Sequence, residues 1–169
     1  MSRNNERDPF ECLRPELPTP EDELCKCADR PPIVLQGHFS SNPIDCLKCN
    51  LEVPPERIGL TAELAGYVAF WRNLHGALYL LWLDSEDYEE WAAKQLEDPK
   101  GRVNVKALEL VRELNKYRRT YYRWFQDQSV DDFIPFRRCP RCSAELVEFA
   151  GSFGPSSVCD QCSIAVWNE

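Results

Sequence analysis

Two pairs of cysteines in the last part of the chain constrain its fold more than any other feature of the sequence. Cys139 and Cys142 form one CxxC motif and Cys159 and Cys162 form another, with residues 143–158 between them. Two residues between paired thiols allow one tight turn to direct both sulfurs at the same metal, and the intervening segment is long enough for a short hairpin to bring the second turn opposite the first. The spacing therefore predicts a zinc ribbon, in which four thiolates close a tetrahedral structural site.

A second group of cysteines upstream also consists of two pairs, and in one of these pairs a single residue separates the cysteines. Cys25 and Cys27 form the CxC motif, and Cys46 and Cys49 form a CxxC motif. A CxC turn directs either both thiolates or only one at a metal, and in the second case His38 or a water fills the fourth place. We expect four cysteine ligands here, and so two structural zinc ions in the whole chain.

Disulfides and a catalytic metal are the alternatives to structural zinc. The nine cysteines are an odd number, and residues 1–7 are polar with no apolar run behind them, so the sequence predicts a cytoplasmic protein with reduced thiols. Open catalytic zinc sites usually include histidine or carboxylate ligands, and the only histidines are His38 and His75. We expect His75 to be a packed or surface-edge residue. Cys12 is left over, and we expect it to be a free thiol.

Composition and charge exclude several classes of protein. The chain has 169 residues, of which 43% are hydrophobic, and this is enough to build one compact core. No stretch approaches the ~20 uninterrupted apolar residues that a membrane span needs. The net charge of -8 argues against general electrostatic attraction to nucleic acid or to anionic lipid.

Breaks and periodicities divide the chain into four expected parts. They are an extended acidic and proline-rich arm (1–24), an N-terminal zinc-ribbon-like module (25–58), a helical core with a following strand (59–128) and a C-terminal four-cysteine zinc ribbon (129–169). The arm is either partly disordered or wraps around the body. The expected fold class is α+β, with a helical middle flanked by two small zinc-ribbon β modules.

Apolar periodicity predicts the elements within these parts. The strongest helical pattern runs over residues 61–83, where apolar side chains recur at three- and four-residue steps. A second helix is expected to be capped by Asp84 or Ser85 and to run through Leu96, with acids in its first turns, where the helix dipole favours negative charge. A third helix is expected over about residues 103–117. Short strands are expected at residues 33–39, 121–125, 145–149 and 164–167.

Charge is distributed unevenly along the helical part. Residues 84–98 are acidic with Lys94 as the lone cation, whereas residues 102–125 are basic and aromatic, a mixture that can hold phosphates and stack bases. The candidate nucleic-acid contacts are Arg118, Arg119, Tyr122, Arg123, Arg137 and Arg138. We favour the alternative, in which residues 121–125 form a half-buried strand whose aromatics fill the core and whose arginines form a solvated face opposite the acidic helix.

An ordered set of motifs runs through most of the chain. The set comprises Cys25 and Cys27, the segment from Ser41 to Cys49 followed by Val53 and Pro54, the segment from Tyr121 to Arg123, and the two C-terminal CxxC pairs. Over about residues 25–168 it resembles a bacterial family of unassigned function, catalogued as zinc-ribbon-containing proteins with a suggested role in nucleic-acid binding. The chain departs from that family in having Ser143 where glycine follows the knuckle, no further cysteines in the helical middle, and no Arg-Leu-x-Ser-Asn ending. The resemblance implies the fold more strongly than it implies a shared partner.

The two separated cysteine clusters and the acidic character also resemble, more loosely, double-CxxC immunity proteins of social soil bacteria. Such proteins are held to neutralise a cognate toxin inside the cell. This resemblance implies a protein partner, because an acidic immunity protein fits the basic active cleft of a nuclease by charge complementarity.

An enzyme is the least supported class. Residues 151–154 are expected to be a turn and not a phosphate-binding loop, and no Ser, His and Asp set stands out. A redox pair at Cys46 and Cys49 is less favoured than zinc, because a second pair of cysteines lies at metal-binding distance. We expect a non-enzymatic zinc protein that binds a macromolecule, with a protein partner ahead of nucleic acid, no membrane and no small-molecule substrate.

Overall fold

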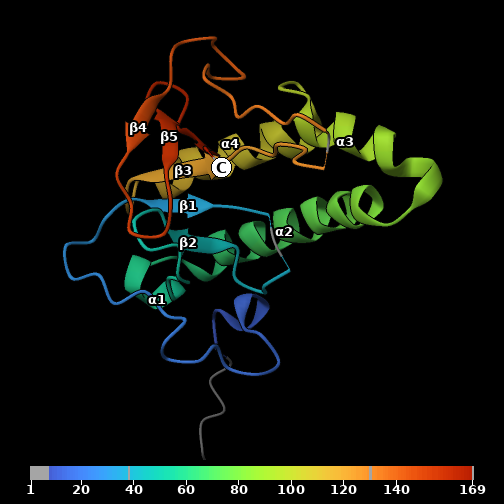
Figure 1. Ribbon diagram of the computed structural model, residues 1–169. Helices are drawn as coiled ribbons and strands as arrows, with labels where there is room; N and C mark the ends of the chain where they lie inside the picture. The colour runs from blue at the N-terminus through green and yellow to red at the C-terminus, as the bar shows by residue number, and fades with distance from the viewer. Residues whose placement is uncertain (1–7, 38, 130, 169) are drawn as a thin grey trace, which may run out of the picture.

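A single sheet organises the molecule (Figure 1). The computed structural model describes residues 8–37, 39–129 and 131–168. Within them, six strands lie in the order β2-β1-β3-β6-β5-β4 across the sheet. The strands are β1 (Ile33–Leu35), β2 (Ile44–Cys46), β3 (Thr120–Arg123), β4 (Val147–Phe149), β5 (Ser156–Cys159) and β6 (Ile164–Trp167).

The middle of the sheet is parallel and its two sides are antiparallel hairpins. Strand β3 runs parallel to β1, with Val34 opposite Tyr121, and parallel to β6, with Tyr122 opposite Ile164. Strand β2 pairs antiparallel with β1, and β5 pairs antiparallel with both β4 and β6. Every residue of the three central strands β1, β3 and β6 is buried except Trp167, which is partly exposed at the end of β6. Such burial is usual for parallel strands.

Strands from both cysteine-bearing parts of the chain therefore meet in one sheet. The predicted mixture of helices and strands is confirmed. The two sets of strands do not form separate flanking sheets, because β3 joins the N-terminal hairpin to the C-terminal one. The sequence also did not predict β2 and β5, which are short and carry polar residues such as Asp45 and Ser157. Both cysteine groups are consequently fixed to the same scaffold.

The helical part contains one long helix and several shorter ones. They are α1 (Pro55–Ile58), α2 (Ala62–Leu83), α3 (Glu89–Glu97) and α4 (Arg102–Leu114), with 3-10 turns η1 (Glu11–Leu13) and η2 (Glu86–Tyr88). The helix predicted over residues 61–83 is confirmed as α2, and the Thr61 hydroxyl accepts a hydrogen bond from the Leu64 N–H at 3.2 Å. Among the described residues, no helix has both the length and the apolar character needed to cross a membrane.

The other two predicted helices are shorter than the sequence indicated. The second starts with η2 and continues as α3, and no side-chain hydrogen bond from Ser85 caps it. The third is α4, which ends at Leu114 because the Asn115 side chain turns the chain into β3. That amide accepts a hydrogen bond from the Thr120 N–H at 3.0 Å and donates one to the Thr120 carbonyl at 3.1 Å.

Helices α2 and α4 pack together and enclose the main core against the sheet. Trp71 of α2 is buried, and its indole N–H donates to the Val103 carbonyl at 3.1 Å. Tyr122 of β3 is fully buried and contacts Trp71 edge-on, while its hydroxyl donates to Asn104 at 2.7 Å. Burial raises the pKa of Tyr122. Large buried aromatics of this kind contribute about 3–5 kcal/mol each to stability.

The segment before the first cysteine packs on the body. Turn η1 lies against α2, and Leu13 is buried in the main core. Arg14 pairs with Asp8 at 2.8 Å and with Glu56 of α1, and the Thr19 hydroxyl donates to Glu52 at 2.8 Å. Of the predicted arm, residues 1–7 lie outside the described residues.

Candidate metal centres

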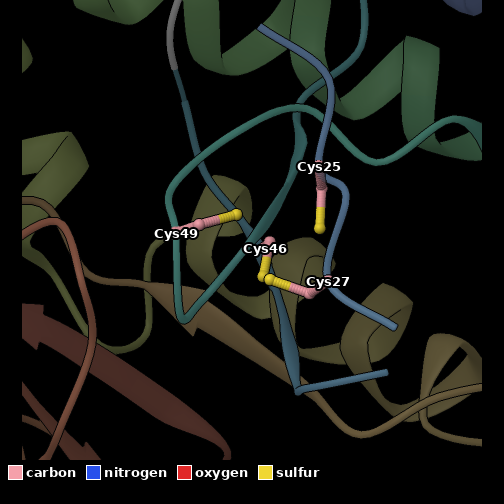
Figure 2. A group of neighbouring side chains, drawn as sticks. All are labelled: Cys25, Cys27, Cys46 and Cys49. Carbon is pink, nitrogen blue, oxygen red and sulfur yellow. The ribbon is translucent and has the colours of Figure 1, made fainter. Parts of the chain in front are cut away.

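The N-terminal cysteines converge on one point. The ligand atoms of Cys25, Cys27, Cys46 and Cys49 all lie within 4.8 Å of one another. Figure 2 shows their sulfurs turned toward a common space between the loop before β1 and the turn after β2. The structure therefore brings together the four cysteines that the sequence predicted. The alternative ligand, His38, lies outside the described residues.

The C-terminal cysteines form a second group of the same kind. Cys139, Cys142, Cys159 and Cys162 also lie with their sulfurs within 4.8 Å of one another. The sulfurs of Cys142 and Cys159 are 3.7 Å apart. For a zinc–sulfur bond of about 2.3 Å, the edge of a tetrahedron is about 3.8 Å. Each group could hold a metal ion, and the sulfur spacing fits a tetrahedral tetrathiolate site.

The backbone builds the CxxC turns in a recurring way. In two of the turns, the N–H of the residue after the second cysteine donates to the carbonyl of the first cysteine. These hydrogen bonds run from Asn50 to Cys46 at 2.8 Å and from Ser143 to Cys139 at 2.9 Å. The residue after the second cysteine is left-handed in all three CxxC motifs, with φ of 54° at Asn50, 60° at Ser143 and 53° at Ser163. This conformation explains why glycine is favoured after such turns.

Backbone N–H groups point at several of the sulfurs. The Ala144 N–H lowers the pKa of Cys142 to about 7, despite some burial. Burial raises the pKa of Cys46, although the N–H groups of Cys49 and Lys48 oppose this. Such donors stabilise a thiolate in the same way that they would stabilise any anion.

Other thiols in the two groups resist ionisation. Burial and the neighbouring cysteines raise the pKa values of Cys49 and Cys162. A bound cation removes this penalty, because the metal takes the thiolate form and neutralises part of the charge. The donor set and its surroundings therefore suit a metal ion better than four free thiols.

Cations lie close to the N-terminal group. Four thiolates around a divalent ion leave a net charge of about -2, which buried surroundings must compensate. Arg118 is buried, donates to the Pro31 carbonyl at 2.7 Å, and is acted on by the charges of Cys46 and Cys25. Arg57 of α1 donates to the carbonyls of Cys25 and Cys27. The cysteine spacing gave no indication of these two arginines.

Three of the predicted nucleic-acid contacts are buried, and that prediction is wrong for them. Tyr122 is fully buried, and Arg118 and Arg123 expose only 7% and 6% of their surface. A base cannot stack on a ring that has no exposed face, and the backbone of a nucleic acid, unlike a small ion, cannot enter the protein to reach a guanidinium that is more than nine-tenths buried. The favoured alternative is also wrong about these arginines, because they do not form a solvated face.

The remaining candidates are on the surface. Arg119 is exposed, pairs with Asp160 at 2.8 Å, and lies over the ring of Tyr121 at 4.6 Å. Arg137 and Arg138 are exposed, and Arg138 donates to the Ser143 carbonyl at 3.1 Å. His75 is buried, as expected for a packed residue, and Cys12 is an exposed free thiol.

Comparison with known proteins adds no family to this description. No protein-family model, no curated protein and no solved structure matches the chain.

Proposed function

We propose that this is a non-enzymatic zinc protein that binds a basic protein partner through the tip of its helical hairpin. The hairpin tip is the turn between α2 and α3 with the side chains of Leu80, Leu83, Tyr88 and Trp91. In Figure 1 this turn lies at the right, at the end of the helices farthest from the labelled strands. The single observation that carries the proposal is the exposure of these apolar side chains together.

The other described residues cover only about half of each apolar side chain at the hairpin tip. Leu80 and Leu83 are 55% and 50% exposed, and Tyr88 and Trp91 are 59% and 50% exposed. Tyr88 and Trp91 also line a shallow cavity of about 380 Å³ with Leu81. Burying such surface is favourable by about 25 cal/mol per Å². Clustered exposure of this kind marks interaction sites, whereas single exposed apolar residues are ordinary.

Carboxylates surround the hairpin tip. Asp84, Glu86, Asp87 and Glu90 are exposed, and Lys94 is engaged by Glu90 at 2.6 Å. Part of this charge stabilises the first turn of α3 through the helix dipole. The rest leaves an apolar centre with an acidic rim, and a complementary partner presents apolar side chains within a basic surface.

Zinc is the metal that the proposal assigns to both cysteine groups. Four thiolates in tetrahedral spacing favour zinc over the hard cations, and a closed tetrathiolate shell leaves no position for substrate. The ligands are Cys25, Cys27, Cys46 and Cys49 at one site, and Cys139, Cys142, Cys159 and Cys162 at the other. The chemistry that zinc supplies here is structural, because it ties short strands and loops to the sheet.

The function is tested by capture of interacting proteins on the zinc-loaded chain. Bound proteins are quantified for the unmodified chain, for the double variant Leu83→Ser/Trp91→Ser, and for the control Leu17→Ser/Val147→Ser. The control residues are 83% and 66% exposed and lie outside the hairpin tip. The proposal expects a basic protein that is lost from the tip variant and kept by the control. Equal capture by all three chains would contradict it.

An immunity role is the second candidate, because the acidic rim suits the basic cleft of a nuclease toxin. It is tested by adding the zinc-loaded chain to a nuclease encoded beside it and measuring DNA or RNA cleavage. Inhibition that disappears in the tip variant supports this role, and unchanged cleavage excludes it for that toxin.

Nucleic-acid binding is the weaker alternative, since its surface is reduced to Arg119, Arg137 and Arg138. Binding to labelled single- and double-stranded DNA and RNA is measured across a salt series, with the Arg119→Ala/Arg137→Ala/Arg138→Ala variant alongside. Affinity that falls steeply with salt and drops in the variant would favour this alternative over a protein partner.

A further inference from the structure

A cavity of about 410 Å³ lies beyond the carboxyl ends of the parallel strands. Gln36 and Gly37 follow β1, Arg123 ends β3, and Trp167 ends β6, and all of them line this cavity. Ligands of sheets with parallel strands characteristically bind at this end, where loops diverge from the strands. The cavity shares no residue with the hairpin tip, so a ligand bound in it is independent of the proposed function.

A buried cation forms part of the cavity wall. The guanidinium of Arg123 donates to Ser156 at 3.0 Å and to Gln36 at 3.3 Å, and lies 3.7 Å from the centre of the Trp167 ring. Its other terminal nitrogen, Nη2, is buried without a hydrogen-bond partner. Among the described residues, no carboxylate forms an ion pair with it. Leaving a buried cationic donor unpaired is costly, so its presence needs a reason.

The electrostatics of Arg123 agree with this geometry. Burial lowers its pKa to about 9, and the charge of Asp45 offsets only part of the effect. That carboxylate accepts a hydrogen bond from Gln36 at 2.7 Å. An anion placed against Nη2 would restore the usual preference of the guanidinium for its charged form.

The rest of the wall is largely aromatic. The rings of Tyr79, Trp82 and Phe125 form a contacting set with centroids 5.0 to 6.4 Å apart. On another side the ring centroids of Phe153 and Trp167 are 5.9 Å apart, and Phe153 is 64% exposed. Such walls suit a planar, apolar body, and a single charged donor fixes its orientation.

We propose that this cavity binds a small organic anion in which one carboxylate, held by Arg123, is attached to an aromatic ring that packs between the aromatic walls. One guanidinium edge matches one carboxylate, and a single cation in a largely aromatic cavity balances a monoanion but not the double charge of a phosphate monoester. This departs from the sequence-based expectation of a protein without a small-molecule ligand. The same chemistry occurs in a free aromatic acid and at the C-terminus of a peptide that ends in an aromatic residue.

The cavity also depends on the N-terminal cysteine group. Asn50 directly follows Cys49, lines the cavity, and has a buried side-chain oxygen without a partner. The cavity wall is therefore continuous with a metal-binding turn. For this reason the experiment uses the zinc-loaded full chain.

The test compares charged and neutral probes of one shape by calorimetry. The probes are indole-3-acetate, its neutral amide indole-3-acetamide, and N-acetyl-Ala-Ala-Trp with a free carboxylate. Indole-3-acetate is expected to bind at least about tenfold more tightly than the amide, as a charge-assisted hydrogen bond predicts. The peptide decides the source of the carboxylate: tighter binding than indole-3-acetate assigns the cavity to a peptide C-terminus, and weaker binding assigns it to a free acid.

Two variants separate a ligand role for Arg123 from a structural one. Arg123→Met removes the buried charge and keeps most of the volume, so the folded protein is expected to be as thermally stable as before or more so. The Arg123→Met variant should bind indole-3-acetate no more tightly than indole-3-acetamide. Phe153→Ala changes an exposed residue of the cavity wall and should weaken the binding of both probes by a similar factor. Phe70→Ala is the matched control, because Phe70 is 60% exposed and lies outside the cavity, and it should leave the binding of both probes unchanged.

Several outcomes overturn the proposal. They are equal binding of acid and amide to the unmodified chain, no binding of any probe at millimolar concentration, and an Arg123→Met variant that keeps the acid preference. If Arg123→Met does not fold, the acid-to-amide ratio of the unmodified chain and the effect of Phe153→Ala decide the matter by the same criteria.

Discussion

At the scale of single residues, the left-handed positions after the cysteine turns carry a measurable cost. Non-glycine residues in this conformation are unfavourable by roughly 1–2 kcal/mol, and asparagine tolerates it better than most. Asn50 meets this demand with a suitable side chain, while Ser143 and Ser163 do not. Among the described residues, neither serine hydroxyl makes a hydrogen bond that offsets the strain.

We expect Ser143→Gly and Ser163→Gly each to stabilise the zinc-loaded protein by about 0.5–1 kcal/mol, because relief of the strain exceeds the added entropy of the unfolded chain. Asn50→Gly serves as the matched control and should be close to neutral. Urea unfolding at saturating zinc measures all three. Loss of stability in both serine variants would show that the hydroxyls have a role that the backbone conformation does not reveal.

At the scale of elements, α3 and the loop after β3 bring two carboxyl groups, those of Glu97 and Asp127, near each other. Partial loss of solvent around the carboxyl and the nearby charge of Asp127 raise the pKa of Glu97. Asp127 itself accepts hydrogen bonds from Ser129 and from the Trp82 indole, which lower its own pKa in spite of burial. A carboxyl with a raised folded-state pKa favours folding while it is protonated, and this contribution is lost as pH rises through that pKa.

Glu97→Gln should therefore raise the melting temperature slightly at pH 7, where Glu97 is charged in the unmodified protein. The difference should vanish near pH 4, where Glu97 is protonated. Glu90→Gln is the control. It should lower the melting temperature at pH 7, because Lys94 lowers the pKa of Glu90 and so stabilises its charged form in the folded protein. Thermal melts at the two pH values measure the effect, and a larger gain at pH 4 than at pH 7 would refute the assignment.

The C-terminal hairpin gives the second prediction at this scale. Cys159→Ser should lower the bound zinc from two ions to one per chain and destabilise β5 and β6, because Cys159 is paired with Ile164 in their ladder. Metal content by mass spectrometry measures the loss. Cys12→Ser, which lies outside both groups, should keep both ions, and retention of both by Cys159→Ser would show the ligand assignment to be wrong.

The sequence predicted those features that depend on neighbours along the chain. The cysteine groups follow from the spacing within each motif, and α2 follows from the period of its apolar residues. The sequence could not predict the pairing of β3 with β1 and β6, because parallel partners lie far apart in the chain. The burial of Arg118 and Arg123 also depends on that pairing, and local alternation of charge and aromatics gives no sign of it.

At the scale of the whole molecule, the shared strand β3 should make the two metal sites and the helical core unfold together. Removing zinc from either group loosens a hairpin that holds one side of β3, and structural zinc contributes on the order of 10 kcal/mol in small peptides. We expect a single transition on heating, with zinc release and loss of far-ultraviolet circular dichroism at the same temperature. Zinc release that is complete while the helical signal persists would indicate independent modules instead.

The position of β3 also sets the order in which a nascent chain can acquire its structure. The first cysteine group is complete once Cys49 has been synthesised, but β1 must wait for α2, α3 and α4 before its parallel neighbour exists. During that interval the β1–β2 hairpin has an open edge that can pair wrongly with another chain. Early metal binding would hold the hairpin in its native register, so zinc supply during translation should influence how much of the protein escapes aggregation.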